Sequence, residues 1–73
     1  MKEFTFKLTD EEVDLMRHLV TDMTAMEIAK KMNVPYFHVQ NMIYKLSSAF
    51  RVRGRVGLVR TSFMMGLVLP SEL

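Results

Sequence analysis

The sequence predicts an all-α fold in which four helices form one small domain. Four stretches place apolar residues three and four positions apart, as in an amphipathic helix, and no segment alternates like a strand over more than a few residues. Two Thr-x-x-Glu motifs, beginning at Thr9 and Thr24, have the form of capping boxes and mark the starts of helices. The 73 residues suffice for a single domain with a modest core.

The first two helices are expected to begin at these two threonines. The first starts at Thr9 and ends near Asp22, because Asp tolerates turn conformations. Its buried stripe is formed by Leu15, Met16, Leu19 and Val20. The second starts at Thr24, and its apolar face is formed by Ala25, Ile28, Ala29 and Met32. Asn33 suits the left-handed position after a helix, and Pro35 suits the first turn of the next one.

The third helix is expected over residues 36–50. Its buried face follows a spacing of four, three and four residues through Val39, Ile43, Leu46 and Phe50. The opposite face is polar but thinly charged, and it carries His38, Gln40, Asn41, Tyr44, Lys45 and Ser48. We also expect three methionines to be exposed and to mark partner surfaces, namely Met26, Met42 and Met64.

The fourth helix is expected to use Gly54 as its N-cap, to end near Met65 and to have Gly66 at its C-cap. Its apolar face consists of Val56, Val59, Phe63 and Leu67, and we expect Leu58 and Met65 to lie off this face. Gly57 weakens such a helix by about 1 kcal/mol relative to alanine. Since a small chain has surplus apolar surface to bury, this face favours self-association through Val59, Phe63 and Leu67.

The charges divide the chain into two unequal halves. Residues 1–29 hold three basic and seven acidic residues, whereas residues 30–73 hold seven basic residues and one acidic residue. Three arginines, Arg51, Arg53 and Arg55, lie within five residues and predict a compact anion site. A basic half is typical of a nucleic-acid binder, but it also fits a solvated surface that maintains solubility.

Several classes of function are disfavoured. The chain has no cysteine, and His18 and His38 lie far apart without a carboxylate cluster, so neither a metal nor another cofactor is expected. No catalytic triad, paired carboxylates or phosphate-binding glycine loop is present, so we expect no enzyme. The longest apolar run is too short to cross a membrane and the N-terminus lacks a signal peptide, which predicts a cytoplasmic protein.

Three segments share their spacing with a known family. They are the opening Leu8-Thr9, the TxxEIAKKM segment from Thr24 and the R-x-R-V-x-L-V segment from Arg53. Together the chain resembles, without gaps over residues 8–68, the LuxR-type (GerE-like) helix-turn-helix family. On this reading residues 1–7 form an N-terminal arm and residues 69–73 a C-terminal tail. The resemblance implies a standalone bacterial or phage transcription regulator of the nucleoid, without the sensor domain that usually precedes this unit.

The resemblance also implies how such a protein binds its target. The third helix enters the major groove of double-stranded DNA, and the fourth helix joins two copies into a dimer that reads two half-sites. The implied DNA-contacting residues are Thr24, His38, Gln40, Asn41, Tyr44, Lys45, Arg51, Arg53 and Arg55.

A second hypothesis keeps the fold and changes the partner. The outer face of the third helix is poor in lysine and includes Phe37 and Met42 on or near it. Such a surface also fits a protein-interaction module that binds and blocks another LuxR-type regulator through the fourth helix, or docks on another transcription component.

Overall fold

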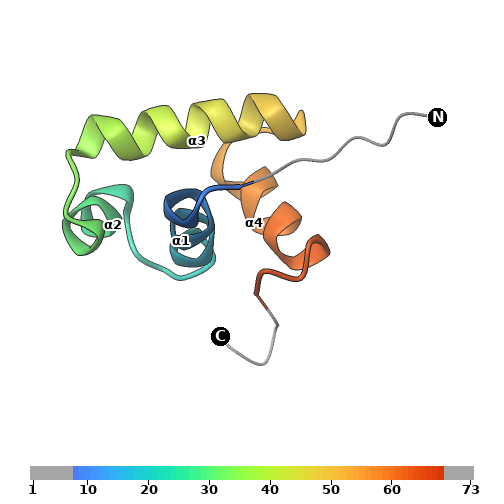
Figure 1. Cartoon of the computed structure of the whole chain (residues 1–73), viewed down its shortest axis with the longest axis horizontal. Helices are drawn as coiled ribbons and strands as arrows, with labels where there is room; N and C mark the ends of the chain where they lie inside the picture. The colour runs from blue at the N-terminus through green and yellow to red at the C-terminus, as the bar shows by residue number, and fades with distance from the viewer. Residues whose placement is uncertain (1–7, 69–73) are drawn as a thin grey trace.

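The chain folds into four α-helices, and the computed structural model describes residues 8–68. The helices are α1 (Asp10–Leu19), α2 (Ala25–Met32), α3 (Tyr36–Phe50) and α4 (Gly54–Met64), and no strand occurs within the described range. The long helix α3 lies across one side of the molecule, with α2 near its beginning and α4 near its end, while α1 lies between α2 and α4 (Figure 1). The all-α prediction is confirmed, whereas the predicted arm 1–7 and tail 69–73 lie outside the described residues.

Both predicted capping boxes are present. The Thr9 hydroxyl accepts a hydrogen bond from the Glu12 amide at 3.1 Å, and the Glu12 carboxylate accepts one from the Thr9 amide at 2.9 Å. Thr24 and Glu27 repeat the arrangement at 3.1 and 2.8 Å. Helix α2 has only eight residues, and a helix this short is marginal by itself, so these reciprocal bonds help to fix where it begins.

Helices α2, α3 and α4 end in the same way, with a left-handed residue that turns the backbone out of the helix. Asn33, Arg51 and Gly66 have φ values of 61°, 59° and 75°. At each end the following amide donates back to a carbonyl five residues earlier, as in a Schellman motif, with N···O distances of 2.9 to 3.0 Å. The prediction for Asn33 is confirmed. Gly66 is left-handed, but the C-cap of α4 is Met65, so the prediction of Gly66 as the C-cap is wrong by one residue, and the pattern at Arg51 was not predicted.

The core lies where the four helices meet. Its buried members are Leu15, Met16, Leu19, Ile28, Ala29, Val39, Met42, Leu46 and Leu58. Met42 is only 7% exposed, so the expectation that it would be exposed is wrong, while Met26 and Met64 are exposed as predicted. Val39, Met42 and Leu46 also follow a spacing of three and four residues, and α3 is rotated so that this stripe faces inward while Ile43 is half-buried.

The first and last helices differ from their predicted bounds and faces. Helix α1 ends at Leu19 rather than near Asp22, because the Thr21 hydroxyl and amide both donate to the His18 carbonyl and close the turn. Arg53, not Gly54, is the N-cap of α4. Leu58 is fully buried, although it was expected to lie off the apolar face, whereas Val56 is 82% exposed.

A close backbone approach explains which face of α4 turns inward. A Cβ atom at Gly57 would lie 2.6 Å from the Val52 Cβ, so only glycine fits at this contact. Two small polar side chains of α4, Thr61 and Ser62, find hydrogen-bond partners within the helix itself. Their hydroxyls donate to the carbonyls four residues earlier, both at 2.9 Å. This small-residue face allows α4 to pack closely, and Leu58 then fills the core.

Candidate nucleic-acid interface

The outer face of α3, the longest helix, is polar. Gln40, Asn41, Tyr44 and Lys45 are all exposed, on the side of α3 opposite to its buried stripe. Helix α3 contains no acidic residue, and none occurs between Lys30 and Arg60. An exposed helix of this length without carboxylates is able to approach a polyanion without like-charge repulsion.

Two of the predicted contact residues on α3 have partners within the protein. The Gln40 side-chain amide donates to the Tyr36 hydroxyl at 2.6 Å, which aligns both side chains along the helix. His38 Nε2 lies 3.1 Å from the Glu11 carboxylate of α1 and therefore ties the beginning of α3 to the first helix. His38 thus lies on the side of α3 that faces α1 and is less exposed than Gln40, Asn41, Tyr44 and Lys45.

The three arginines after α3 do not form one cluster. Arg51 and Arg53 are exposed, and no side-chain hydrogen bond or ion pair of either is found within residues 8–68. The Arg55 guanidinium instead donates from Nε to the Leu19 carbonyl at 3.1 Å and from Nη2 to the Thr21 carbonyl at 2.9 Å. Arg55 therefore holds the end of α1, and two arginines rather than three are left for an external anion.

Thr24 lies at the start of α2, where its hydroxyl already accepts a bond from the Glu27 amide. Its hydroxyl hydrogen is still available to a phosphate, because that oxygen acts only as an acceptor in the cap. The first backbone amides of a helix point outward at its N-terminus, so the position of Thr24 suits the phosphate contact that was predicted for this residue.

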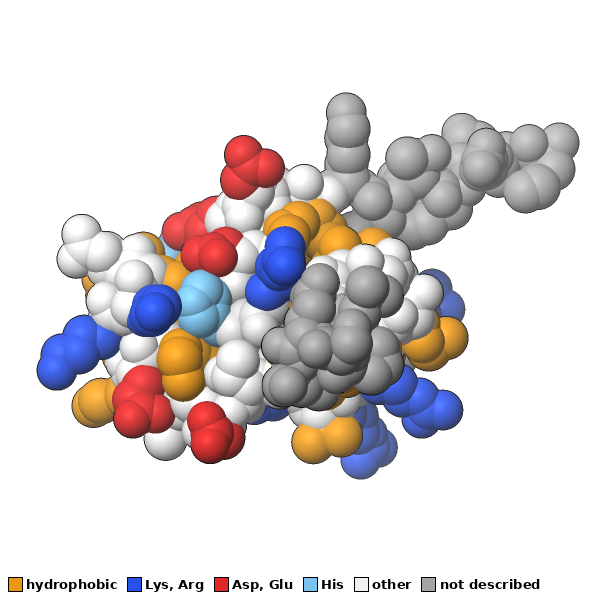
Figure 2. All heavy atoms as spheres, turned by 90° about the horizontal axis from the view of Figure 1, so that it is seen from below, with side chains coloured by type: hydrophobic (Ala, Val, Ile, Leu, Met, Phe, Trp, Pro, Cys, Tyr) orange, Lys and Arg blue, Asp and Glu red, His pale blue; other side chains and the backbone are white. Residues whose placement is uncertain are grey.

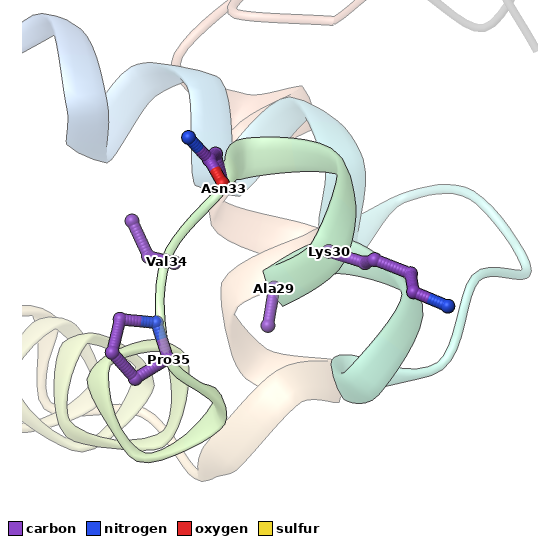
Figure 3. Close-up of a pocket in the computed structure, with 5 residues that line it drawn as sticks. All are labelled: Ala29, Lys30, Asn33, Val34 and Pro35. Carbon is purple, nitrogen blue, oxygen red and sulfur yellow. The ribbon is translucent and has the colours of Figure 1, made fainter.

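A tight turn of residues 33–35 connects α2 to α3. Pro35 is the N-cap of α3 and makes no side-chain cap bond, with φ −64° and ψ 152°. The turn borders a shallow depression lined by Ala29, Lys30, Asn33, Val34 and Pro35, and the Lys30 side chain extends away from it (Figure 3). The depression is apolar at Val34 and Pro35 and too open to enclose a small molecule. The turn beside it connects α2 to α3 and does not form a substrate pocket.

Acidic side chains lie on the other helices. Figure 2 views the molecule from the side opposite α3 and shows Asp and Glu side chains there, together with Lys and Arg side chains. In the described range all carboxylates belong to α1, α2 or the loop between them: Asp10, Glu11, Glu12, Asp14, Asp22 and Glu27. The charge asymmetry of the sequence is therefore partly a spatial one: α3 and its arginine connector contain no carboxylate, although Glu11 of α1 lies 3.1 Å from His38.

The residues expected at a dimer contact lie along α4 and just after it. Val59, Phe63 and Leu67 are all half-buried, and Val59 and Leu67 pack against the chain's own core. Val56 and Met64 are 82% and 79% exposed and lie on the outward side of the same helix. The apolar surface of α4 that is open to solvent thus includes two residues that were not singled out for this contact.

Two aromatic residues on α3 were also not predicted as site residues. Tyr36 is 44% and Phe37 66% exposed, and both lie at the beginning of α3. Helical periodicity could have predicted their exposure, because positions 36, 37, 40 and 44 lie on the side of the helix opposite the Val39–Leu46 stripe.

Within residues 8–68 no group of His, Asp and Glu side chains is arranged to hold a metal ion. Over the same residues, no helix combines the length and the apolar character needed to cross a membrane. The described residues define a small all-helical protein with an acid-free helix on one side. Comparison with protein-family models, curated proteins and solved structures finds no match for this chain.

Proposed function

We propose that this protein is a DNA-binding transcription regulator of the LuxR type, in which α2 and α3 act as a helix-turn-helix unit. The observation that carries the proposal is the outer face of α3, which has no acidic residue and is followed directly by Arg51 and Arg53, two exposed arginines without a side-chain bond to residues 8–68. Helix α3 enters the major groove, and the two arginines and Thr24 bind phosphates at its edges. The protein acts in the cytoplasm at the nucleoid as a homodimer, with no cofactor and no catalytic activity.

The side chains on α3 and directly after it divide into a group that binds the DNA backbone and a group that reads base edges. Lys45, Arg51 and Arg53 supply positive charge that favours any duplex, whereas Gln40 and Asn41 carry the amide groups that pair with adenine edges. Tyr44 contributes a hydroxyl at the centre of the exposed face. Arg55 is left out of the contact set because its guanidinium is bound to the end of α1.

The test is a titration of labelled genomic and random duplexes, monitored by fluorescence anisotropy at several salt concentrations. Wild-type protein should bind duplex DNA with an affinity that falls steeply as salt increases. Arg53→Glu should weaken binding to every sequence at least about 10-fold and reduce the salt slope by about one or more, while Gln40→Ala should change sequence preference.

The matched control is Lys31→Glu, which changes the net charge by the same amount. Lys31 is exposed on α2 and borders a depression shared with Asp14 and Arg17 of α1, away from the α3 connector. It should change affinity by less than about 3-fold, since a distant exposed charge is screened. Equal effects of the two reversals, or no duplex binding at low salt, would contradict the proposal.

A second candidate is a protein-interaction module that binds another regulator of this type. The observation favouring it is that α4 and its C-cap expose three large apolar side chains, Val56, Met64 and Met65, since exposed apolar surface marks protein contacts. Pull-down with wild-type protein after nuclease treatment tests it. Retention of a transcription regulator that Met64→Lys releases would support this candidate, and a partner set lost on nuclease treatment would count against it.

A further inference from the structure

The outer face of α3 carries three exposed aromatic rings. Tyr36, Phe37 and Tyr44 are 44%, 66% and 74% exposed. None of the three belongs to the core cluster or to the apolar residues packed against it. Exposed rings on one face of one helix are a surface that gains free energy when a flat, apolar partner covers it.

The rings are arranged along the helix in a regular way. Tyr36, Gln40 and Tyr44 recur every four residues and so lie on one ridge, with an axial step of about 6 Å between neighbours. The 2.6 Å hydrogen bond from Gln40 to the Tyr36 hydroxyl fixes the first ring along this ridge. Phe37 lies two turns before Tyr44 on nearly the same line. We call Tyr36, Phe37, Gln40 and Tyr44 the aromatic ridge.

Cations lie at both ends of the aromatic ridge. Lys30 and the exposed Met26 line a shallow depression together with Tyr36 at its beginning. Lys45 lies on α3 beside Tyr44, and Arg51 and Arg53 follow the end of the helix. No acidic residue occurs in the sequence from Lys30 to Arg60, but Glu27 lines the depression shared by Lys30 and Tyr36, so the positive charge that attracts a phosphate backbone lies mainly at the end of the ridge, at Lys45, Arg51 and Arg53.

The chemistry of the ridge differs from that needed to read a closed duplex. The groove of a duplex presents donors, acceptors and thymine methyl groups, while the flat faces of the bases are hidden in the stack. The Phe37 ring has no polar atom with which to read an edge. Flat base faces become available where bases are unpaired, and proteins that bind such DNA combine aromatic rings with a cationic track.

We infer that the aromatic ridge of α3 stacks on unpaired bases in single-stranded or locally opened DNA, with Lys45, Arg51 and Arg53 binding the flanking phosphates. This inference rests on the proposed DNA binding by the outer face of α3 and specifies the state of the DNA that this face prefers. Single strands and opened duplexes present the same unstacked bases, and separate probes distinguish them.

The experiment compares three labelled probes of one sequence by fluorescence anisotropy: a perfect duplex, the same duplex with a central run of mismatched pairs, and one of its strands. Each stacked base contributes about 5- to 150-fold in affinity. Wild-type protein should therefore bind the mismatched duplex at least about 5-fold more tightly than the perfect duplex. Binding of the single strand alone at this level would assign the preference to free strands and would also support the inference.

The variants Phe37→Ala and Tyr44→Ala test whether the rings produce this preference. Phe37→Ala should weaken binding of the mismatched duplex by at least about 5-fold and change perfect-duplex binding by less than about 2-fold, whereas Tyr44→Ala should weaken binding of the mismatched duplex by at least about 5-fold more than binding of the perfect duplex. Tyr44→Phe keeps the ring and should keep the preference. Val56→Ala is the matched control, because Val56 is 82% exposed but lies on α4. Circular dichroism should show all four variants folded, since each altered side chain is exposed.

Four results would overturn the inference. Equal affinity of the wild type for perfect and mismatched duplexes would do so while leaving the proposed duplex binding intact. Equal loss on both probes in Phe37→Ala and Tyr44→Ala would make the rings general duplex contacts. A change in the sedimentation of these variants without DNA, with the probe preference retained, would make the ridge a protein contact. Failure to bind any probe would remove the proposed function together with the inference.

Discussion

Gly57 lies where the connector between α3 and α4 passes closest to the last helix. A Cβ at this position would come within 2.6 Å of the Val52 Cβ and 2.9 Å of its Cγ2. We predict that Gly57→Ala lowers the free energy of unfolding by about 1–3 kcal/mol, because overpacking outweighs the gain in helix propensity. Urea unfolding followed by circular dichroism measures the change.

The control for this prediction is the pair Val52→Ala and Val52→Ala/Gly57→Ala. Val52→Ala removes the 2.9 Å contact with Cγ2 but keeps the 2.6 Å contact with Cβ, so Gly57→Ala should be only partly less destabilising in the Val52→Ala background than in the wild type. A higher urea midpoint for Gly57→Ala alone would mean that helix propensity dominates at this position.

Arg51 combines an exposed charge with a left-handed backbone. Its φ of 59° and ψ of 46° are unfavourable for a residue with a Cβ by about 1–2 kcal/mol. Arg51→Gly should therefore stabilise the protein by about 0.5–1 kcal/mol after the greater chain entropy of unfolded glycine is subtracted. The same variant should weaken DNA binding, because it removes a cation beside α3. Thermal unfolding and duplex titration measure the two opposite effects.

Two substitutions separate these contributions. Arg51→Ala removes the charge but keeps the Cβ, so it should weaken DNA binding without the gain in stability. Arg53 has a φ of −106°, and Arg53→Gly should lower stability by about 0.5–1 kcal/mol. If Arg51→Gly were no more stable than Arg51→Ala, the left-handed conformation would carry no cost.

At the scale of elements, Arg55 joins the beginning of α4 to the end of α1. Its two hydrogen bonds, at 3.1 and 2.9 Å, satisfy the carbonyls of Leu19 and Thr21, which have no helical partner at the end of α1. Positive charge at a helix C-terminus is also favoured by the helix dipole. Arg55 therefore stabilises the arrangement of the two helices rather than an external ligand.

We predict that Arg55→Ala lowers the free energy of unfolding by about 1.5–3 kcal/mol, as expected for hydrogen bonds to a charged group. In a domain of this size each 1 kcal/mol shifts the Tm by about 4–8 °C, which a thermal scan resolves. Arg60→Ala, an exposed arginine on the same helix, should leave the Tm nearly unchanged. An unchanged Tm for Arg55→Ala would mean that the Arg55 hydrogen bonds do not stabilise the fold and that its guanidinium is available to an external anion.

The ends of the helices were predictable to different degrees. Both capping boxes, and the left-handed residue Asn33, follow from residue types that act within one turn of the chain. The end of α1 was misplaced because Thr21 closes the turn on the His18 carbonyl and the Arg55 guanidinium, 36 residues away from Leu19, binds the carbonyls that follow. No pattern within the first helix carries that information.

At the scale of the whole molecule, α4 leaves apolar side chains in solvent. Met64 is 79% exposed in the last turn of α4, where a positive charge interacts favourably with the helix dipole. We predict that Met64→Lys shifts the proposed homodimer to monomer and leaves the Tm of the monomer unchanged, because the ammonium must be desolvated only in the dimer. Sedimentation equilibrium over a range of protein concentrations measures the shift.

Met26→Lys is the control, since Met26 is 67% exposed but lies on α2. Val56→Glu is an independent second variant at the beginning of α4, where the dipole favours negative charge. A wild-type protein that sediments as a monomer at every concentration, or a Met64→Lys variant with the same dimer as the wild type, would contradict this surface as the site of self-association.

The candidate site was also predictable in part. The sequence placed Gln40, Asn41, Tyr44 and Lys45 on one exposed side of the third helix, because helical periodicity assigns faces wherever one stripe is clearly apolar. It placed Ile43 rather than Met42 in the buried stripe and was wrong for Met42, because both residues continue the stripe from Val39. It also did not separate Arg55 from Arg51 and Arg53, which the structure directs to different surroundings.

The sequence by itself determined the all-helical class, the starts of α1 and α2 and the acid-free character of α3, because these depend on residues within a few positions of one another. The tertiary structure decided which side of α4 faces inward, which arginine is held by α1 and where α1 ends. In α4 apolar residues occur on several sides, so its rotation is set by the contact between Gly57 and Val52. Such choices depend on how closely two segments can approach in space.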